Sequence, residues 1–146
     1  MTDDRPATPS RPATPSRPAA VVLVDAANVI GSRPNGWWRD RAGAARRLVE
    51  QLRASVAAGV LEASIVVVLE GAARPGAEEG DAGGVRVVHA AGGADDLLVE
   101  LAAASAVPVV VITADRELRC RVGAAGGSTA GPEWLLGRLG RRDGSP

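Results

Sequence analysis

The sequence predicts a three-layer α/β/α fold, in which helices cover both faces of a central, mostly parallel sheet of four to five strands. Short, continuous apolar runs rich in Val and Ile are typical of strands that are buried on both faces. Helical patterns lie between these runs, so right-handed crossovers join the strands into a parallel sheet. The length of 146 residues fits one domain with one core.

Strands and helices alternate along the chain. The predicted strands are residues 21–24, 64–69, 85–88 and 109–112, with a short fifth strand at 128–130. The predicted helices are residues 40–58, 94–106, 116–124 and 132–139. In the first of these helices, Ala44, Leu48 and Leu52 share one apolar stripe, and Pro132 suits the first position of the last helix. The segment 71–84 is expected to be a mobile acidic loop, either solvated or closing over the site.

The two ends of the chain differ in composition from this core. Residues 5–10 read RPATPS and residues 11–16 repeat it, which offers little that is apolar enough to bury. We expect a disordered tail over residues 1–18, a single domain over 19–141 and a C-terminal tail over 142–146. No run approaches the roughly 20 apolar residues that span a membrane, and the acidic start lacks the features of a secretory signal. A cytoplasmic protein without membrane association is therefore expected.

The composition excludes several kinds of site. The chain has 17 basic and 17 acidic residues, and every basic residue is Arg. The absence of Lys excludes a Walker A loop and Schiff-base chemistry. A single Cys and a single His exclude disulfide frameworks and the common zinc motifs. A net charge of zero argues against a protein that coats nucleic acid by bulk charge.

Carboxylates follow four of the predicted strands. In strand order they are Asp25, Glu70, the pair Asp95 and Asp96, and Asp115. The carboxyl ends of parallel strands share one edge of the sheet, where ligands bind. Two carboxylates about 4 Å apart repel by about 4 kcal/mol at an effective dielectric of about 20, so a divalent cation would stabilise the cluster. Ligation by oxygen alone favours Mg²⁺ or Mn²⁺.

Each acid also has a simpler explanation. Asp95 and Asp115 stand where a helix N-cap would, and Glu70 suits a solvated loop. Asp25 is harder to explain in this way, because it directly ends an apolar strand. These interpretations stay open beside the metal site.

Three segments resemble one family. VDAANVIGS, after the first strand, resembles the opening DxxN segment of PIN-like nucleases, in the NYN branch close to the bacterial YacP-like proteins. GGADD resembles that branch's Gly-rich turn into the helix that carries its middle Asp, and VITADREL resembles its T-x-D-R-E-L segment. The resemblance covers about residues 20–140 in order, and it implies a PIN-like fold with a divalent metal at a ribonuclease site.

The resemblance also implies roles for particular residues. Asp25, Asp95 and Asp115 match the family's core acids and are expected to hold the metal, directly or through water. Asn28 matches the Asn of the opening segment, and its amide is expected to orient Asp25 or a water. These four residues are the expected catalytic set.

Other polar residues near this edge have weaker assignments. Asp96 and Glu70 are auxiliary candidates for the metal. Thr113 is expected to brace its loop by bonding the backbone, without a chemical role. His89 is expected to be structural, and Trp134 is expected to pack in the core.

Arginine and tryptophan side chains near the same edge suit a nucleic-acid substrate. Guanidinium groups bind phosphate through paired hydrogen bonds, although each of these arginines also suits a solvated surface. The candidates are Arg33, Arg39, Arg41 and Arg116, with Arg116 as the first choice. Trp37 and Trp38 follow a Gly-containing loop, where one ring is expected to stack on a base and the other to fill the core, and Trp37 is the candidate for the substrate contact.

The leading hypothesis is a metal-dependent endoribonuclease that hydrolyses RNA phosphodiesters, in mRNA or tRNA, with water activated by Mg²⁺ or Mn²⁺. A nucleotide phosphohydrolase with the same metal site is an alternative, and the neutral net charge fits its small substrate. A second alternative is a non-catalytic module that binds RNA or the ribosome. The retention of all three core acids argues against the module.

Overall fold

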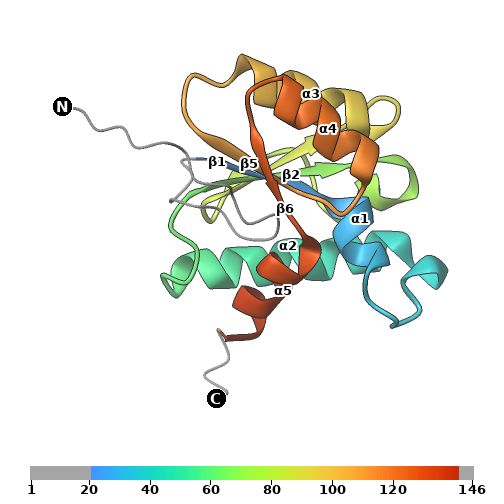
Figure 1. Ribbon diagram of the computed structural model, residues 1–146. Helices are drawn as coiled ribbons and strands as arrows, with labels where there is room; N and C mark the ends of the chain where they lie inside the picture. Colours follow the sequence, from blue (N-terminus) through green and yellow to red (C-terminus); the bar gives the residue numbers. More distant parts are fainter. Residues whose placement is uncertain (1–20, 142–146) are drawn as a thin grey trace.

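A computed structural model describes residues 21–141, so the tails expected at 1–18 and 142–146 lie outside the described residues. Strands and helices alternate along this part of the chain (Figure 1). The strands are β1 Val21–Asp25, β2 Ser64–Leu69, β3 Gly80–Ala82, β4 Val85–His89, β5 Val109–Ile112 and β6 Ser128–Ala130. The helices are α1 Ala26–Gly31, α2 Arg41–Ala57, α3 Ala94–Ala104, α4 Arg116–Ala124 and α5 Pro132–Arg141, with the 3-10 helices η1 Trp37–Arg39 and η2 Gly71–Gly76. None of these described helices is long and apolar enough to cross a membrane.

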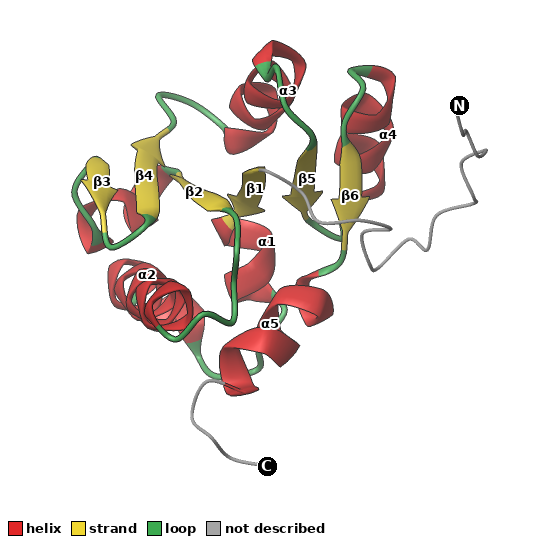
Figure 2. Cartoon of the chain, turned by 90° about the vertical axis from the view of Figure 1, so that its left-hand side faces the viewer, coloured by secondary structure: helices red, strands yellow, loops and turns green. Residues whose placement is uncertain are grey.

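The six described strands form one sheet in the order β3-β4-β2-β1-β5-β6 (Figure 2). All neighbouring strands run parallel except β3, which is antiparallel to β4. Strand β1 is central, since Val24 lies opposite Val67 of β2 and opposite Ile112 of β5. The predicted fold class is confirmed, and the sheet has six strands where four to five were expected.

Helices cover both faces of the sheet, as Figures 1 and 2 show. Helices α1, α2 and α5 pack on one face, where Val22 and Val24 are buried. Helices α3 and α4 pack on the other face, where Leu23 contacts the cluster that contains Leu98 and Leu118. Successive side chains of a strand point to opposite faces, so β1 contributes to both halves of the core.

The segment expected to be a mobile acidic loop is structured. Helix η2 packs against α2, and a Cβ atom at Gly76 would collide with the carbonyl oxygen of Ala42. The following β3 pairs with β4, with Asp81 opposite Arg86. Backbone hydrogen bonds to β4 hold β3, whose short polar sequence carries no apolar alternation. The expectation of a loop over 71–84 is therefore wrong, because a 3-10 helix and an edge strand occupy this segment.

Helix α1 begins directly after β1, without a connecting loop. Asp25 is both the last residue of the strand and the N-cap of the helix, because its side chain accepts the backbone N–H of Asn28. Val29 and Ile30 bury the inner side of this single short helix. The abrupt change from strand to helix places Asp25 and Asn28 at the carboxyl edge of the sheet.

Candidate active site

The winding of the chain changes direction between β1 and β5. From β1 the chain proceeds to β2 and β4 on one side of the sheet, and from β5 it proceeds to β6 on the other side. Ligands bind at such a switch point in open α/β sheets, at the carboxyl ends of the strands. Asp25 ends β1, and residues 113–115 directly follow β5. These residues therefore border the position that the topology favours for a site.

Asp25 is a buried carboxylate with 4% of its surface exposed. Its Oδ2 accepts a hydrogen bond from Oγ1 of Thr113 at 2.9 Å, and its Oδ1 accepts the backbone N–H of Asn28 at 3.3 Å. Burial above all, with a smaller contribution from the negative charges of Asp95 and Glu70, raises the pKa of Asp25 from 3.8 to about 6 against the opposing effect of these two bonds. A cation beside Asp25 would therefore favour its charged form.

Thr113 and Asn28 fix the loop between β5 and α4. Thr113 is fully buried, and its Oγ1 also accepts the backbone N–H of Asp115 at 3.1 Å. The side-chain Oδ1 of Asn28 accepts the backbone N–H of Ala114 at 2.8 Å. The amide of Asn28 thus orients this loop, whereas Asp25 takes only the backbone N–H of Asn28. Thr113 braces the loop as expected and in addition binds Asp25.

Asp95 and Asp115 lie at the starts of α3 and α4. Asp115 caps its helix, because its Oδ1 accepts the backbone N–H of Leu118 at 3.0 Å. Asp95 does not cap its helix, since the N-cap position belongs to Gly93 and the helix already begins at the residue before Asp95. Burial, followed by the negative charges of Asp115 and Glu70, raises the pKa of Asp95. The capping explanation therefore holds for Asp115 and is wrong for Asp95.

Glu70 connects the end of β2 to the start of α3. Its Oε1 accepts the backbone N–H of Ala94 at 2.9 Å, one of the donors that a helix leaves unpaired at its N-terminus. Its charge also acts on Asp25 and Asp95, as their raised pKa values show. Glu70 is thus part of the same group of acids. We call Asp25, Glu70, Asp95 and Asp115 the acidic edge.

Asp96 points its carboxylate into an ion pair. Its Oδ1 lies 2.8 Å from Nη2 of Arg121 on α4, and its side chain is 78% exposed. This surface pair joins α3 to α4. In this arrangement the carboxylate of Asp96 binds Arg121 and not the other acids. Its auxiliary role at a metal stays a prediction.

The donor atoms of the acidic edge fit a hard divalent cation in their chemistry. Glu70 and Asp115 each have one carboxylate oxygen bound to a backbone N–H, which leaves their second oxygen for another partner. Within residues 21–141, however, no three His, Cys, Asp or Glu side chains are gathered closely enough to hold a metal ion. Mg²⁺ usually keeps several waters and takes only one or two carboxylates. The residues therefore fit an ion that is bound partly through water.

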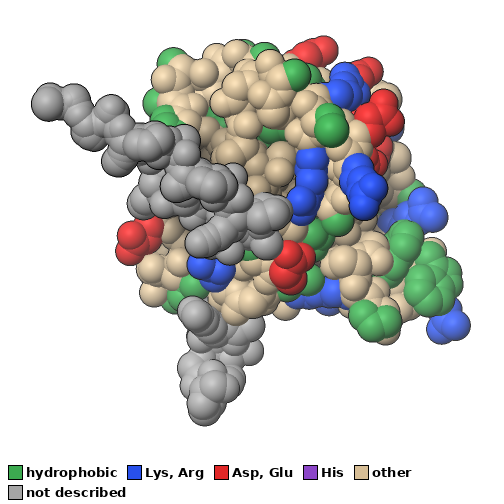
Figure 3. Space-filling model, viewed as in Figure 1, with side chains coloured by type: hydrophobic (Ala, Val, Ile, Leu, Met, Phe, Trp, Pro, Cys, Tyr) green, Lys and Arg blue, Asp and Glu red, His purple; other side chains and the backbone are tan. Residues whose placement is uncertain are grey.

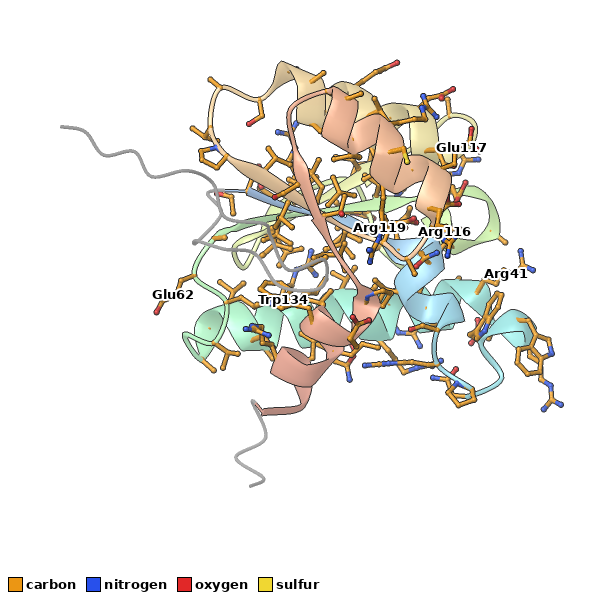
Figure 4. All side chains as sticks on the ribbon, viewed as in Figure 1. Arg41, Glu62, Arg116, Glu117, Arg119 and Trp134 are labelled. Atoms are coloured by element: carbon orange, nitrogen blue, oxygen red, sulfur yellow. The ribbon has the colours of Figure 1, made fainter. Side chains whose placement is uncertain are left out.

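Two arginines of α4 lie beside the acidic edge. Arg116 is exposed and directly follows Asp115, and Arg119 lies one turn further along the same helix (Figure 4). The Nε of Arg119 donates to the carbonyl oxygen of Thr113 at 2.9 Å. Figure 3 shows basic side chains gathered on this face over α4. Arg119 is missing from the sequence-based candidates, although its spacing from Arg116 puts both on one side of a helix.

The tryptophan pair occupies η1. Trp37 packs against the core, whereas Trp38 is 53% exposed, and the two rings meet edge to face at 5.9 Å. The guanidinium of Arg41 lies 5.4 Å from the ring centre of Trp37, and that of Arg39 lies 5.7 Å from that of Trp38. One ring thus contacts the core and one is exposed, as expected for the pair. The more exposed ring is Trp38, while Trp37, the expected substrate contact, is half-buried.

Three further residues singled out from the sequence make contacts within the protein. Arg33 donates to Oε1 of Gln51 on α2 at 3.3 Å, and burial lowers its pKa, so it packs between α1 and α2. The Nε2 of His89 lies 2.7 Å from the carbonyl oxygen of Ala77 and ties β4 to the segment after η2. Trp134 is partly buried and packs against the core. Arg33 is therefore occupied by a protein contact, and His89 and Trp134 have the roles expected of them.

Comparison with known proteins finds solved structures with the same architecture. No family model matches the sequence, and no curated protein matches it. Two crystal structures of Rae1 (YacP) from Bacillus subtilis, one of them a point mutant, superpose with TM-scores of 0.67 and 0.62. This chain has the YacP fold. The match covers 84% of this chain and 75% and 76% of the two Rae1 chains, with 19% sequence identity. The YacP fold agrees with the family resemblance of the three segments.

Proposed function

We propose that this protein is a metal-dependent endoribonuclease, which hydrolyses phosphodiester bonds of RNA with water activated by Mg²⁺ or Mn²⁺. The observation that carries the proposal is the acidic edge at the switch point of a YacP fold, where burial and then the charges of neighbouring acids raise the pKa values of Asp25 and Asp95. The resemblance of the three segments to NYN nucleases supports the same chemistry, because it assigns a metal to Asp25, Asp95 and Asp115.

These three carboxylates would hold the ion, with Glu70 as a further oxygen donor. A divalent ion bound there would supply hydroxide at neutral pH and stabilise the charge of a phosphoryl group under in-line attack. Thr113 and the backbone of Asn28 hold Asp25 in place for this role. Asp25 ends β1, Glu70 follows β2, Asp95 lies in the first turn of α3 and Asp115 precedes α4, so the fold itself sets their spacing.

The arginines of α4 would bind the substrate. Arg116 is exposed next to Asp115, and a guanidinium suits the paired oxygens of a phosphate. Arg119 is anchored on the carbonyl of Thr113, which fixes its position relative to Asp25. The two side chains would thus position phosphates of the RNA backbone beside the acids. No covalent intermediate is required, because water is the nucleophile.

A nucleotide phosphohydrolase with the same metal site is the second candidate. The net charge of zero favours it, since a small substrate needs less positive surface than a long polyanion. The two candidates differ in the substrate and share the acidic edge, so one assay separates them. A non-catalytic module that binds RNA or the ribosome would show binding without turnover.

The test is a cleavage assay with Mg²⁺, Mn²⁺ or EDTA and a panel of labelled single-stranded RNA, total tRNA and nucleoside triphosphates. Asp95→Asn and Asp115→Asn are the informative variants. Glu62→Gln is the matched control, because Glu62 is exposed at the opposite edge of the sheet (Figure 4). The proposal predicts metal-dependent RNA cleavage that both informative variants lose and the control keeps. Turnover of triphosphates alone would establish the second candidate instead.

A further inference from the structure

A pocket of about 530 Å³ lies next to the acidic edge. Its volume is within the range of about 300–1,000 Å³ typical of small-ligand sites. Its walls come from α1, η1, the start of α2, η2 and the loop between β4 and α3. The residues that define its chemistry are Ile30, Trp37, Arg41, Glu70, Arg74 and Gly93. Glu70 belongs both to the pocket and to the acidic edge, so the two adjoin at this residue.

The walls of the pocket are held by contacts that exist without a ligand. Helix η2 is pressed against α2 at Gly76, where a side chain would collide with the backbone of Ala42. The Nη1 of Arg74 donates to the carbonyl oxygen of Ala90 at 3.5 Å, which links η2 to the end of β4. The loop on the other side is tied by Glu70, whose Oε1 accepts the N–H of Ala94. The pocket is therefore preformed in its backbone.

The lining of the pocket has an apolar part and a basic part, with the acid Glu70 on the side of the acidic edge. Ile30 and Trp37 supply the apolar surface, together with several alanines of η2 and the neighbouring loop. Arg41 and Arg74 supply two positive charges, and both side chains are exposed at the rim. The Arg41 guanidinium lies 5.4 Å from the ring centre of Trp37, so a flat cation and an aromatic ring stand together. A flat ring joined to a phosphate is complementary to both parts.

We propose that this pocket binds one unstacked nucleotide of a single-stranded RNA, with its base against Trp37 and the apolar wall and its phosphate on Arg41 and Arg74. The inference rests on the proposed function, since it names the part of the RNA that lies beside the reacting bond. Because the pocket adjoins the acidic edge at Glu70, the next phosphate of a bound strand would lie toward the acids. Bases of any kind stack on an aromatic ring. The pocket would therefore position the strand relative to the acidic edge without strong preference for one base.

The test measures binding to the metal-free full chain in EDTA, so that it does not depend on cleavage. Nucleoside 5′-monophosphates, ribose 5-phosphate and inorganic phosphate are titrated into ¹⁵N-labelled protein, and the amides of Gly92 and Gly93 in the pocket wall are followed. The proposal predicts saturable shifts with the monophosphates and binding at least several-fold weaker for the two ligands without a base. Equal binding of inorganic phosphate, or no shift of these amides, would overturn it.

Variants locate the phosphate contact. Arg41→Ala and Arg74→Ala are each expected to weaken monophosphate binding by about tenfold, since each removes a charged donor to phosphate. Arg46→Ala is the matched control, because Arg46 is exposed on α2 and does not line this pocket. Arg41 and Arg74 are exposed at the rim, so their replacement leaves the buried core intact, and Arg74→Ala also removes a wall contact, the bond to the carbonyl of Ala90. Unchanged binding in both variants would contradict the proposal.

Titration with an RNA tetranucleotide distinguishes an RNA strand from a free nucleotide as the occupant of the pocket. The proposal predicts that the tetranucleotide shifts the same amides at lower concentration than a monophosphate does. Shifts by monophosphates without shifts by the tetranucleotide would assign the pocket to free nucleotides and overturn the RNA assignment. If the protein binds nucleotides but cleaves no RNA, the proposed nuclease function is refuted and the nucleotide pocket stands. If Arg41→Ala and Arg74→Ala leave RNA cleavage unchanged, only the pocket proposal is refuted.

Discussion

Thr113 and Asp25 are 88 residues apart in the chain and are joined by a 2.9 Å hydrogen bond from Oγ1 to Oδ2. The bond connects the ends of β5 and β1, the two strands between which the winding of the chain changes direction. It is also the stronger of the two contacts that lower the pKa of the buried Asp25 carboxyl. The charge and the position of Asp25 therefore depend on Thr113.

Replacing Thr113 by Val should raise the pKa of Asp25 above about 6, because the hydroxyl that favours the charged form is lost. The backbone N–H of Asp115 also loses its acceptor. We expect a loss of about 1–3 kcal/mol in the free energy of unfolding at pH 7. Thr113→Ser keeps the hydroxyl and should behave as the wild type. The carboxyl carbon resonance of Asp25, followed against pH, measures the shift, and an unchanged pKa in the Val variant would contradict the assignment.

The raised pKa of Asp25 makes stability depend on pH. The folded chain keeps this proton up to about pH 6, whereas the unfolded chain releases it near 3.8. Stability is therefore lost as the pH rises from about 4 to about 6, and the full penalty is present above that range. A pKa difference of about 2 corresponds to about 3 kcal/mol.

The variant Asp25→Asn lacks this titration. Its free energy of unfolding should exceed that of the wild type by an amount that grows between pH 4 and 6 and then stays constant. Urea denaturation of both proteins at a series of pH values gives the difference directly, so that other titrating groups cancel. A difference that does not vary with pH over this range would show that Asp25 titrates normally.

Replacing Asn28 by Ala should loosen the loop after β5. The side-chain oxygen that accepts the N–H of Ala114 is removed, while the backbone N–H that binds Asp25 remains. We expect a loss of about 1 kcal/mol in stability and faster hydrogen exchange at the amide of Ala114, with no change in the pKa of Asp25. Asn28→Asp keeps an oxygen acceptor and should retain the protection of that amide. Exchange as slow in the Ala variant as in the wild type would refute this role.

The hydrogen bonds among Asp25, Asn28 and Thr113 could hardly be predicted from the sequence. The strands that position these residues could. The apolar runs at Ser64–Leu69, Val109–Ile112 and the short Ser128–Ala130 segment predicted strands with the bounds that the structure has. In β2 and β5, burial on both faces favours apolar residues, so the signal is strong. Strand β3 carries no such signal, because its residues Gly80–Ala82 are exposed and only backbone pairing defines it.

The acids were predictable as a group, and their partners were not. Each acid follows a strand, so the parallel topology alone brings Asp25 and Asp115 to one edge. The bond of Glu70 to the N–H of Ala94 joins residues from different elements, and nothing in the local sequence indicates it. For the same reason the sequence left a capping role open for Asp95, whereas Gly93 takes the N-cap position and Glu70 accepts the N–H of Ala94.

Arg116 should contribute to substrate affinity more than to turnover. Removing it as Arg116→Ala should raise KM for RNA with little change in kcat, and it should reduce the dependence of log KM on log salt by about one unit, as expected for the loss of one phosphate contact. Arg46→Ala on α2 serves as the control for a loss of one positive charge. Steady-state kinetics at several salt concentrations supply the comparison, and a fall in kcat at constant KM would assign Arg116 to the chemical step instead.

The central claim is that the acidic edge is the metal-dependent catalytic site of a ribonuclease. The most direct measurement is cleavage of labelled RNA by the wild type and by Asp95→Asn and Asp115→Asn, with Mn²⁺ or Mg²⁺ and with EDTA. We predict cleavage by the wild type that requires the metal, a loss of at least about 100-fold in both folded variants, and full activity in Glu62→Gln. Cleavage that persists in EDTA, or that either Asn variant retains in full, would contradict the account.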